Sequence, residues 1–258
     1  MRSAVLWTGL GADRLAPLTP NAWLRVDLVG RMLPAEVRDV LEVGCGEGAL
    51  GVRLARGRDY LGLEPDPDSY QVARQRFTEA GHGEVRQAHT WDLGGEERFD
   101  AVCAFEVLEH IKDDAAALAE WAGRLRPGGW LLLSVPAHQR RFGPADELVG
   151  HFRRYDPDAM AELLAGSGFT DIHVRQYGMP LGYLLETVRN AVGRRRLAAA
   201  PEASMAERTG ASGRLLQPRG SWRGVTARWG TAPFRYLQRV FPHTGTGLVV
   251  RARFTPEA

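Results

Sequence analysis

The chain reads Val40-Leu41-Glu42-Val43-Gly44-Cys45-Gly46-Glu47-Gly48-Ala49-Leu50 at the point where an apolar run meets three closely spaced glycines. The run before Gly44 has the character of a buried strand, and the segment after the last glycine has the spacing of a helix. Glycine permits positive φ and close approach of the backbone to a ligand, while the first turn of a helix offers free N–H groups. This strand, turn and helix predict a site for a nucleotide-like ligand.

An acidic residue ends the next apolar run. Tyr60-Leu61-Gly62-Leu63 precedes Glu64, whose carboxylate can accept hydrogen bonds from both hydroxyls of a ribose. Read two residues later, Gly46-x-Gly48-x-x-Gly51 also satisfies the dinucleotide fingerprint and would indicate a nicotinamide-dependent dehydrogenase. The apolar run ends at Val43, however, so the tight turn begins at Gly44, which disfavours the dehydrogenase.

Short apolar runs alternate with segments of helical period, the pattern of an α/β fold with a mostly parallel sheet covered by helices. The sequence predicts strands near residues 39–45, 59–64, 83–88, 99–105, 129–136, 169–177 and 246–254. It predicts helices over residues 20–33, 47–57, 67–80, 113–126 and 156–166.

The alternation breaks between residues 178 and 245. Eleven arginines and two glutamates lie between Arg189 and Arg239, which indicates an insertion rather than another strand and helix. Apolar residues recur in it at helical spacing: Trp222, Val225 and Trp229, then Phe234, Leu237, Val240 and Phe241. The insertion is therefore expected to be helical, either as a lid packed on the domain or as a peripheral surface for an anionic or lipid-like partner.

Composition indicates one domain over residues 1–258, with a helical segment at 1–34 and the insertion at 178–245. All basic residues except Lys112 are arginine and the net charge is only +2, so we attribute the arginine content to codon usage and expect no nucleic-acid partner. Cys45 and Cys103 lie in apolar contexts and predict no disulfide. No stretch approaches the ~20 apolar residues of a spanning helix or forms a signal peptide, so the cytoplasm is the expected compartment.

Several motifs together resemble the class I S-adenosylmethionine-dependent methyltransferases, including the ubiquinone-pathway O-methyltransferases. They span roughly residues 35–177 and comprise Leu41 to Gly48, Glu64, Phe99-Asp100-Ala101-Val102, Glu106-Val107-Leu108-Glu109-His110 and Arg126-Pro127-Gly128-Gly129. The resemblance implies a Rossmann-like, seven-stranded sheet whose last strand is antiparallel. It also implies S-adenosylmethionine as methyl donor.

The resemblance further implies which residues hold this cofactor. The loop would hold its amino-acid half, Glu64 its ribose, and the segment after the third strand its adenine, where His89 replaces an Asp of many relatives. An arginine of the first helix either reaches the cofactor carboxylate or lies in solvent. The implied residues are Arg25, Glu42, Gly44, Cys45, Gly46, Glu64, Pro65, Thr90, Trp91 and Phe105.

Methyl transfer to a hydroxyl gains from a general base, and histidine suits neutral pH. The candidates are His110 and His151, which follow the fourth and fifth strands at the edge of the sheet where ligands bind. His151 belongs to Gly150-His151-Phe152-Arg153-Arg154-Tyr155, a run that resembles one in bacterial small-molecule and glycan-associated methyltransferases. It is either the base or a structural residue, and Arg153 and Arg154 either bind an anionic substrate or form surface ion pairs.

A metal is the remaining alternative at this edge. On a helical turn Glu106, Glu109 and His110 would share a face, and with His151 they would suit a divalent cation such as Mg²⁺. The Glu-x-x-Glu-His string resembles both metal-using methyltransferases and relatives that use none.

These observations predict O-methylation of a small molecule, with an amine as the less favoured acceptor. An RNA ribose methyltransferase with a divalent metal and a catalytically inactive cofactor-binding scaffold are the alternatives.

Overall fold

The computed structural model describes residues 17–199 and 221–256, with the side chains of 221–226 left out, and is built on one seven-stranded sheet. The strands are β1 (Asp39–Val43), β2 (Asp59–Leu63), β3 (Glu84–Arg86), β4 (Phe99–Phe105), β5 (Leu125–Pro136), β6 (Phe169–Gly178) and β7 (Gly245–Phe254). Their order across the sheet is β3-β2-β1-β4-β5-β7-β6, and only β7 pairs antiparallel with its neighbours. The α/β class, all seven strands and the antiparallel last strand are as predicted.

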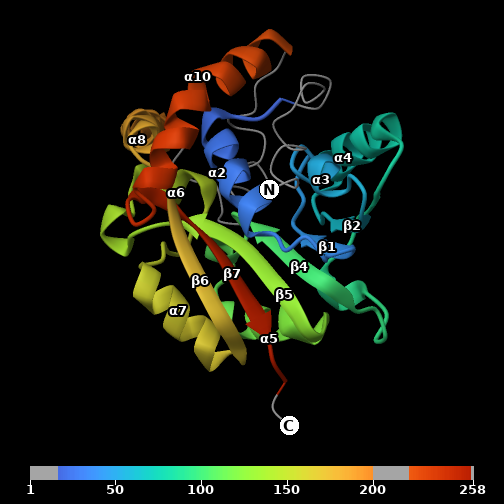
Figure 1. Ribbon diagram of the computed structural model, residues 1–258. Helices are drawn as coiled ribbons and strands as arrows, with labels where there is room; N and C mark the ends of the chain where they lie inside the picture. The colour runs from blue at the N-terminus through green and yellow to red at the C-terminus, as the bar shows by residue number, and fades with distance from the viewer. Residues whose placement is uncertain (1–16, 200–220, 257–258) are drawn as a thin grey trace.

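Helices cover both faces of this sheet (Figure 1). They are α2 (Pro20–Met32), α3 (Gly51–Leu54), α4 (Pro67–Ala80), α5 (Asp114–Gly123), α6 (Pro144–Val149), α7 (Pro157–Gly166), α8 (Leu181–Ala199) and α10 (Ser221–Val240). Local chemistry defines several ends: Thr19 caps α2, Asp66 caps α4, and Gly81 ends α4 in the left-handed conformation. Of the predicted segment 1–34, residues 1–16 lie outside the described part.

The core consists of two clusters on opposite faces of the sheet. Successive residues of a strand point to opposite faces, so Ala101 and Cys103 of β4 join the cluster beneath α2, while Val102 and Ala104 join the cluster beneath α5 and α7. All four are at most 1% exposed. Burial on both faces explains why the central strands read as continuous apolar runs.

The helix predicted over residues 47–57 is much shorter in the structure, where α3 covers only Gly51–Leu54. Gly44, Gly46 and Gly48 all have positive φ, a conformation that a right-handed helix excludes. The chain therefore remains a loop through Gly48, and this longer loop leaves its backbone available to a ligand.

The predicted helical insertion lies between β6 and β7 as α8 and α10. Figure 1 shows α8, α10 and α2 together at the end of the sheet opposite α7. Gln238 ties α10 to α2 by donating to the Leu24 carbonyl over 2.9 Å, and Arg239 pairs with Asp27. Trp222 and Val225, which the sequence places on this helix, lie outside the described side chains.

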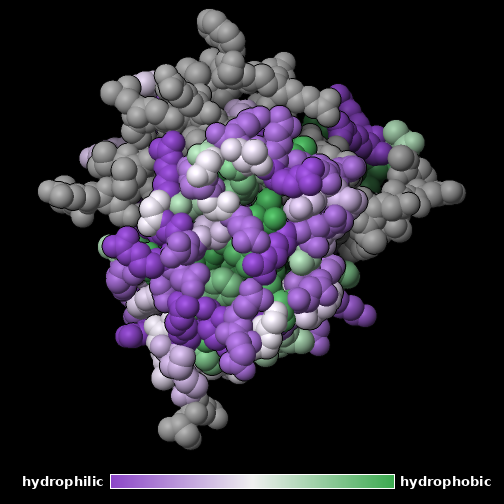
Figure 2. Space-filling model, turned by 90° about the vertical axis from the view of Figure 1, so that its right-hand side faces the viewer, coloured by the Kyte–Doolittle hydropathy of each residue, from purple (hydrophilic) through white to green (hydrophobic). Residues whose placement is uncertain are grey.

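The surface in Figure 2 is mostly hydrophilic, with hydrophobic atoms gathered in a central strip. Within the described ranges, no helix combines the length and the hydropathy needed to cross a bilayer.

Candidate functional site

The glycine-rich loop is bound to β2 on one side and is open on the other. Cys45 N–H donates to the Leu63 carbonyl over 2.9 Å, which fixes the loop over β2. A Cβ at Gly44 would lie 2.8 Å from Val107 Cγ2, whereas a Cβ at Gly46 would meet nothing within 4 Å. The backbone at Gly46 therefore borders open space, which is the cradle that a ligand held by main-chain groups requires.

Glu64 lies at the end of β2 beside this loop. Its Oε2 accepts from Gly46 N–H over 2.8 Å, and its Oε1 accepts from Asp66 N–H over 2.9 Å. Burial raises the pKa of this carboxyl. Each carboxylate oxygen can accept more than one hydrogen bond, so Glu64 can hold the loop and still accept from ribose hydroxyls.

Glu42 lies on β1 and is buried. Tyr60 Oη donates to Glu42 Oε2 over 2.6 Å, and burial raises the pKa of Glu42 to about 8. Glu42 is therefore near the predicted cofactor loop, with its carboxyl engaged by Tyr60.

The other implied cofactor residues differ in exposure. Thr90 and Phe105 are buried, Pro65 is exposed directly after Glu64, and Trp91 is 65% exposed. The Trp91 ring stacks on His89 with 4.1 Å between ring centroids. This stacked pair leaves a large aromatic surface beside the turn that follows β3.

Arg25 of α2 lies half-buried against Glu106, which follows β4. The two side chains form an ion pair at 3.1 Å. Ser134 Oγ and Tyr177 Oη donate to the same carboxylate oxygen over 2.9 and 3.3 Å. Burial opposes ionisation of Glu106, but Arg25 and Ser134 outweigh it and lower its pKa. Arg25 is thus paired within the chain and is not a solvated helix residue.

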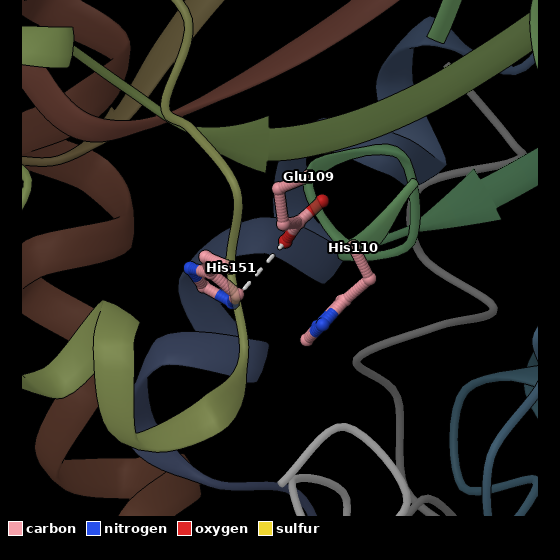
Figure 3. Close-up of side chains that lie close together, drawn as sticks. All are labelled: Glu109, His110 and His151. Carbon is pink, nitrogen blue, oxygen red and sulfur yellow. Dashed lines mark ion pairs between the residues drawn. The ribbon is translucent and has the colours of Figure 1, made fainter. Parts of the chain in front are cut away.

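Three of the four candidate metal ligands come together (Figure 3). Glu109 and His110 lie on a 3₁₀ turn, Leu108–His110, and His151 approaches from the loop after α6. One ligand atom from each lies within 4.8 Å of the others, and the two imidazole rings are 4.6 Å apart. Glu106 precedes the turn with a φ of 59°, so it does not share their face and pairs with Arg25 instead.

The Glu109 carboxyl is fully buried, and its two oxygens, like His110 Nδ1, have no hydrogen-bond partner in the described structure. Burial and then Glu106 raise the pKa of Glu109 far above its usual range. Burial also lowers the pKa of His110 to about 4. Orphaned polar atoms in a buried cluster are a costly arrangement unless a proton or a cation satisfies them.

His151 is fixed by a carboxylate that sequence reasoning missed. Its Nδ1 lies 2.8 Å from Asp146 Oδ1, while its Nε2 lies 3.8 Å from Glu109 Oε1. Burial opposes ionisation of Asp146, but the hydrogen bonds from His151 and Arg154 lower its pKa to about 2. An ionised carboxylate at Nδ1 favours the tautomer with the proton on Nδ1, which leaves the Nε2 lone pair free.

Asp146 connects this histidine to α8. Arg154 bonds both Asp146 and Glu186, with Arg154 Nη1 3.1 Å from Glu186 Oε1, and Arg141 pairs with the same Glu186 at 3.2 Å. Arg153 pairs with Asp114 at 2.7 Å. Both arginines that the sequence offered for an anionic substrate therefore form ion pairs within the chain.

A pocket with about 420 Å³ of empty space, part of it open to solvent, lies between α2, α6, α8 and the ends of the strands. The residues that carry its chemistry are Glu106, His151, Arg154, Tyr177, Glu186 and Arg189. The lining is therefore mainly polar and charged.

Comparison with known proteins identifies the class. A family model described as a methyltransferase domain matches residues 19–174. A ubiquinone biosynthesis O-methyltransferase of Xanthomonas axonopodis pv. citri is 40% identical over 134 residues, which are 50% of this chain and 55% of that protein. A probable S-adenosylmethionine-dependent methyltransferase of Mycobacterium tuberculosis is 33% identical over 160 residues, 59% of this chain and 57% of that protein. The chain spans about half the length of the curated relatives it matches.

Solved structures agree in fold. Phosphoethanolamine N-methyltransferase 2 of Haemonchus contortus, in complex with S-adenosyl-L-methionine, aligns with a TM-score of 0.58 at 17% identity over 98% of this chain and 56% of that chain. The YcgJ protein of Bacillus subtilis aligns with a TM-score of 0.60 at 13% identity over 92% of this chain and all of that one. The chain belongs to the methyltransferase-domain family of class I, S-adenosylmethionine-dependent proteins.

Proposed function

We propose that the protein transfers the methyl group of S-adenosylmethionine to a hydroxyl of a small molecule, with His151 as general base. The observation that carries this proposal is the fixed orientation of His151, whose Nδ1 is bound to Asp146 and whose ring borders the pocket. Ubiquinone biosynthesis O-methyltransferases are among the relatives, which supports a hydroxyl acceptor over an amine.

The cofactor would supply an electrophilic methyl group on a sulfonium. The open backbone at Gly46 and the carboxylate of Glu64 would hold it, and Phe105 would border it at the end of β4. Holding the acceptor oxygen in line with the methyl group can supply up to ~7–11 kcal/mol of the barrier reduction. His151 Nε2 would accept the hydroxyl proton, and Asp146 would stabilise the imidazolium that results.

The test is turnover on a panel of catechols with His151→Gln and Asp146→Asn. His151→Gln is expected to reduce kcat by about 10²–10⁴-fold, the usual contribution of a general base, while S-adenosylhomocysteine binding in calorimetry stays unchanged. Asp146→Asn is expected to lower kcat in the same direction, because a neutral amide no longer fixes the tautomer. His173→Gln is the matched control, since His173 is exposed, lies on β6 and pairs with Asp171 on the same strand.

An unchanged kcat for His151→Gln would remove the histidine from the mechanism. Tight cofactor binding without methyl transfer to any member of a wider acceptor panel would instead support the inactive scaffold.

We further propose that Glu109, His110 and His151 can bind one divalent cation. Their orphaned atoms support it, because a cation would satisfy Glu109 and His110 at once. Two imidazoles and one carboxylate suit Zn²⁺, Fe²⁺ or Mn²⁺ better than Mg²⁺, which prefers oxygen ligands. A bound cation would orient an acceptor with adjacent hydroxyls, and His151 would then serve as ligand rather than as base.

Metal content separates these two roles. Elemental analysis after dialysis against Mn²⁺ or Zn²⁺ is expected to find about one ion per chain, and Glu109→Gln is expected to lose it. Glu162→Gln, at an exposed position of α7, is the control. Equal metal content in the wild type and in Glu109→Gln would refute the metal site. The cluster would then be a set of neutral side chains with a proton on Glu109.

A further inference from the structure

The pocket beside His151 contains one guanidinium group, that of Arg189, with no hydrogen bond or ion pair to the described residues, and from it we infer that the acceptor carries a carboxylate bound by Arg189. The inference rests on the proposed methyl transfer and adds the substrate class to it.

Every other charged side chain that lines the pocket forms an ion pair with a described residue. Each of its three carboxylates lies between 2.7 and 3.2 Å from a guanidinium: Glu106 from Arg25, Asp146 from Arg154, and Glu186 from Arg141 and Arg154. Glu109 is not among the residues that line this pocket. Within the described residues, each pocket carboxylate is therefore ion-paired with an arginine other than Arg189, although the charge of Arg189 helps to lower the pKa of Glu106.

Arg189 is the charged residue of the pocket that forms no such ion pair with the described residues. It lies half-buried on α8 and borders the same pocket, but it makes no hydrogen bond and no ion pair with any residue in 17–199 or 227–256. Three other residues of α8 also line the pocket: Glu186, Leu185 and Gly182. They lie three, four and seven residues before Arg189, a spacing that places all four on one face of the helix. The guanidinium therefore belongs to the pocket-facing side of this helix.

The magnitude of the charge favours a carboxylate over a phosphate. One unpaired guanidinium balances a single negative charge, whereas a phosphate monoester carries about −1.5 to −2 at neutral pH. The planar guanidinium fork also matches a carboxylate with two parallel hydrogen bonds. An acceptor with a carboxylate on Arg189 would place another part of the molecule toward His151, because both side chains border one pocket.

The experiment is a calorimetric titration of the full chain saturated with S-adenosylhomocysteine. The probes are 3,4-dihydroxybenzoate, its uncharged methyl ester and phenyl phosphate. The acid is expected to bind at least about tenfold more tightly than the ester, the difference typical of one charge-assisted hydrogen-bonded pair. Arg189→Gln is expected to remove this preference and Arg189→Lys to retain part of it, while Arg194→Gln, exposed on the same helix, is expected to keep it in full.

Equal binding of acid and ester, no binding of the acid, or a preference that survives Arg189→Gln would each overturn the inference. Tighter binding of phenyl phosphate than of the acid would overturn the choice of carboxylate. Because Arg189 has no partner in the described structure, its substitution is expected to leave the melting temperature unchanged, so a lost preference would not reflect unfolding.

Replacing S-adenosylhomocysteine with S-adenosylmethionine in the same mixtures separates this inference from the proposed function. Preferential binding of the acid with no methyl transfer would refute O-methylation and leave the carboxylate site standing. Methyl transfer to the acid and to the ester at equal efficiency would support O-methylation and refute the carboxylate site at Arg189.

Discussion

Glu42 is a buried residue whose charge state should make stability depend on pH. Burial raises its pKa to about 8 from an ordinary value of 4.5. The folded chain therefore binds this proton more tightly than the unfolded chain does. The contribution of Glu42 to stability is complete below about pH 4.5 and is lost as the pH rises through 8.

Glu42→Gln removes this titration and leaves an amide oxygen that can accept from Tyr60, which donates to Glu42 over 2.6 Å. The variant is expected to exceed the wild type in free energy of unfolding by roughly 2–4 kcal/mol at pH 9 and by little at pH 5, measured by urea denaturation. Glu84→Gln, at an exposed position, is the control. Identical pH dependence of the variant and the wild type would show that Glu42 ionises freely in the folded state.

For individual residues, the sequence predicted the reactive side chains of the candidate site but not the side chains that they contact. Glu109, His110 and His151 stand out because the motifs contain them. Asp146 and Glu186 occur in polar segments, where most carboxylates lie in solvent, and no spacing rule connects either with His151. Only the folded chain brings them together, since Arg154 bridges both.

Helix α10 is held on the domain by a buried glutamine. Gln238 is fully buried, donates to the Leu24 carbonyl of α2 over 2.9 Å, and accepts from Gly178 N–H over 3.3 Å. Removing its amide removes both hydrogen bonds, each of which typically contributes ~0.5–1.5 kcal/mol.

Gln238→Ala is therefore expected to lower the free energy of unfolding by about 1–3 kcal/mol, the sum of two such hydrogen bonds. Amide exchange should also become faster in α10 than in the sheet. Tyr236→Ala, on the exposed side of the same helix, should change neither. Equal exchange of α10 in the wild type and Gln238→Ala would mean that apolar packing alone holds this helix.

The ends of a helix were predictable where a capping residue or a glycine nearby in the sequence defines them. Helix α4 begins at Pro67 after its cap Asp66 and ends at Ala80 before Gly81, which matches the predicted 67–80. The predicted helix at 47–57 was wrong at its start, because hydrophobic period does not reveal that three glycines adopt positive φ. Helix α6 was missed because its six residues, Pro144–Val149, are too few to show a period.

Across the whole molecule, the short apolar runs predict seven strands, and the family resemblance adds the antiparallel last strand, but the order of the strands in the sheet comes only from the structure. The pocket is a property of the complete fold, since Asn21 of α2, Glu106 after β4 and Arg189 of α8 line it from segments far apart in the chain. Arg189 could not be distinguished in the sequence from the ten other arginines of its segment. Its distinguishing property is that it lines the pocket and makes no hydrogen bond or ion pair with the described residues.

Cofactor binding should stabilise the whole molecule, because a ligand bound only by the folded state adds RT ln(1 + [L]/Kd) to the free energy of unfolding. At a concentration 100 times Kd, S-adenosylhomocysteine is expected to add about 2.7 kcal/mol and to raise the melting temperature. Glu64→Ala should reduce the affinity by roughly 10- to 100-fold, because the variant lacks a charged acceptor for the ribose hydroxyls. Glu64 also accepts from Gly46 N–H, so Glu64→Gln, which keeps an acceptor for the loop, separates ribose binding from loop order. Thermal shifts that are equal in the wild type, Glu64→Gln and Glu64→Ala would move the ribose away from the end of β2, whereas no shift in any of the three would refute cofactor binding by this fold.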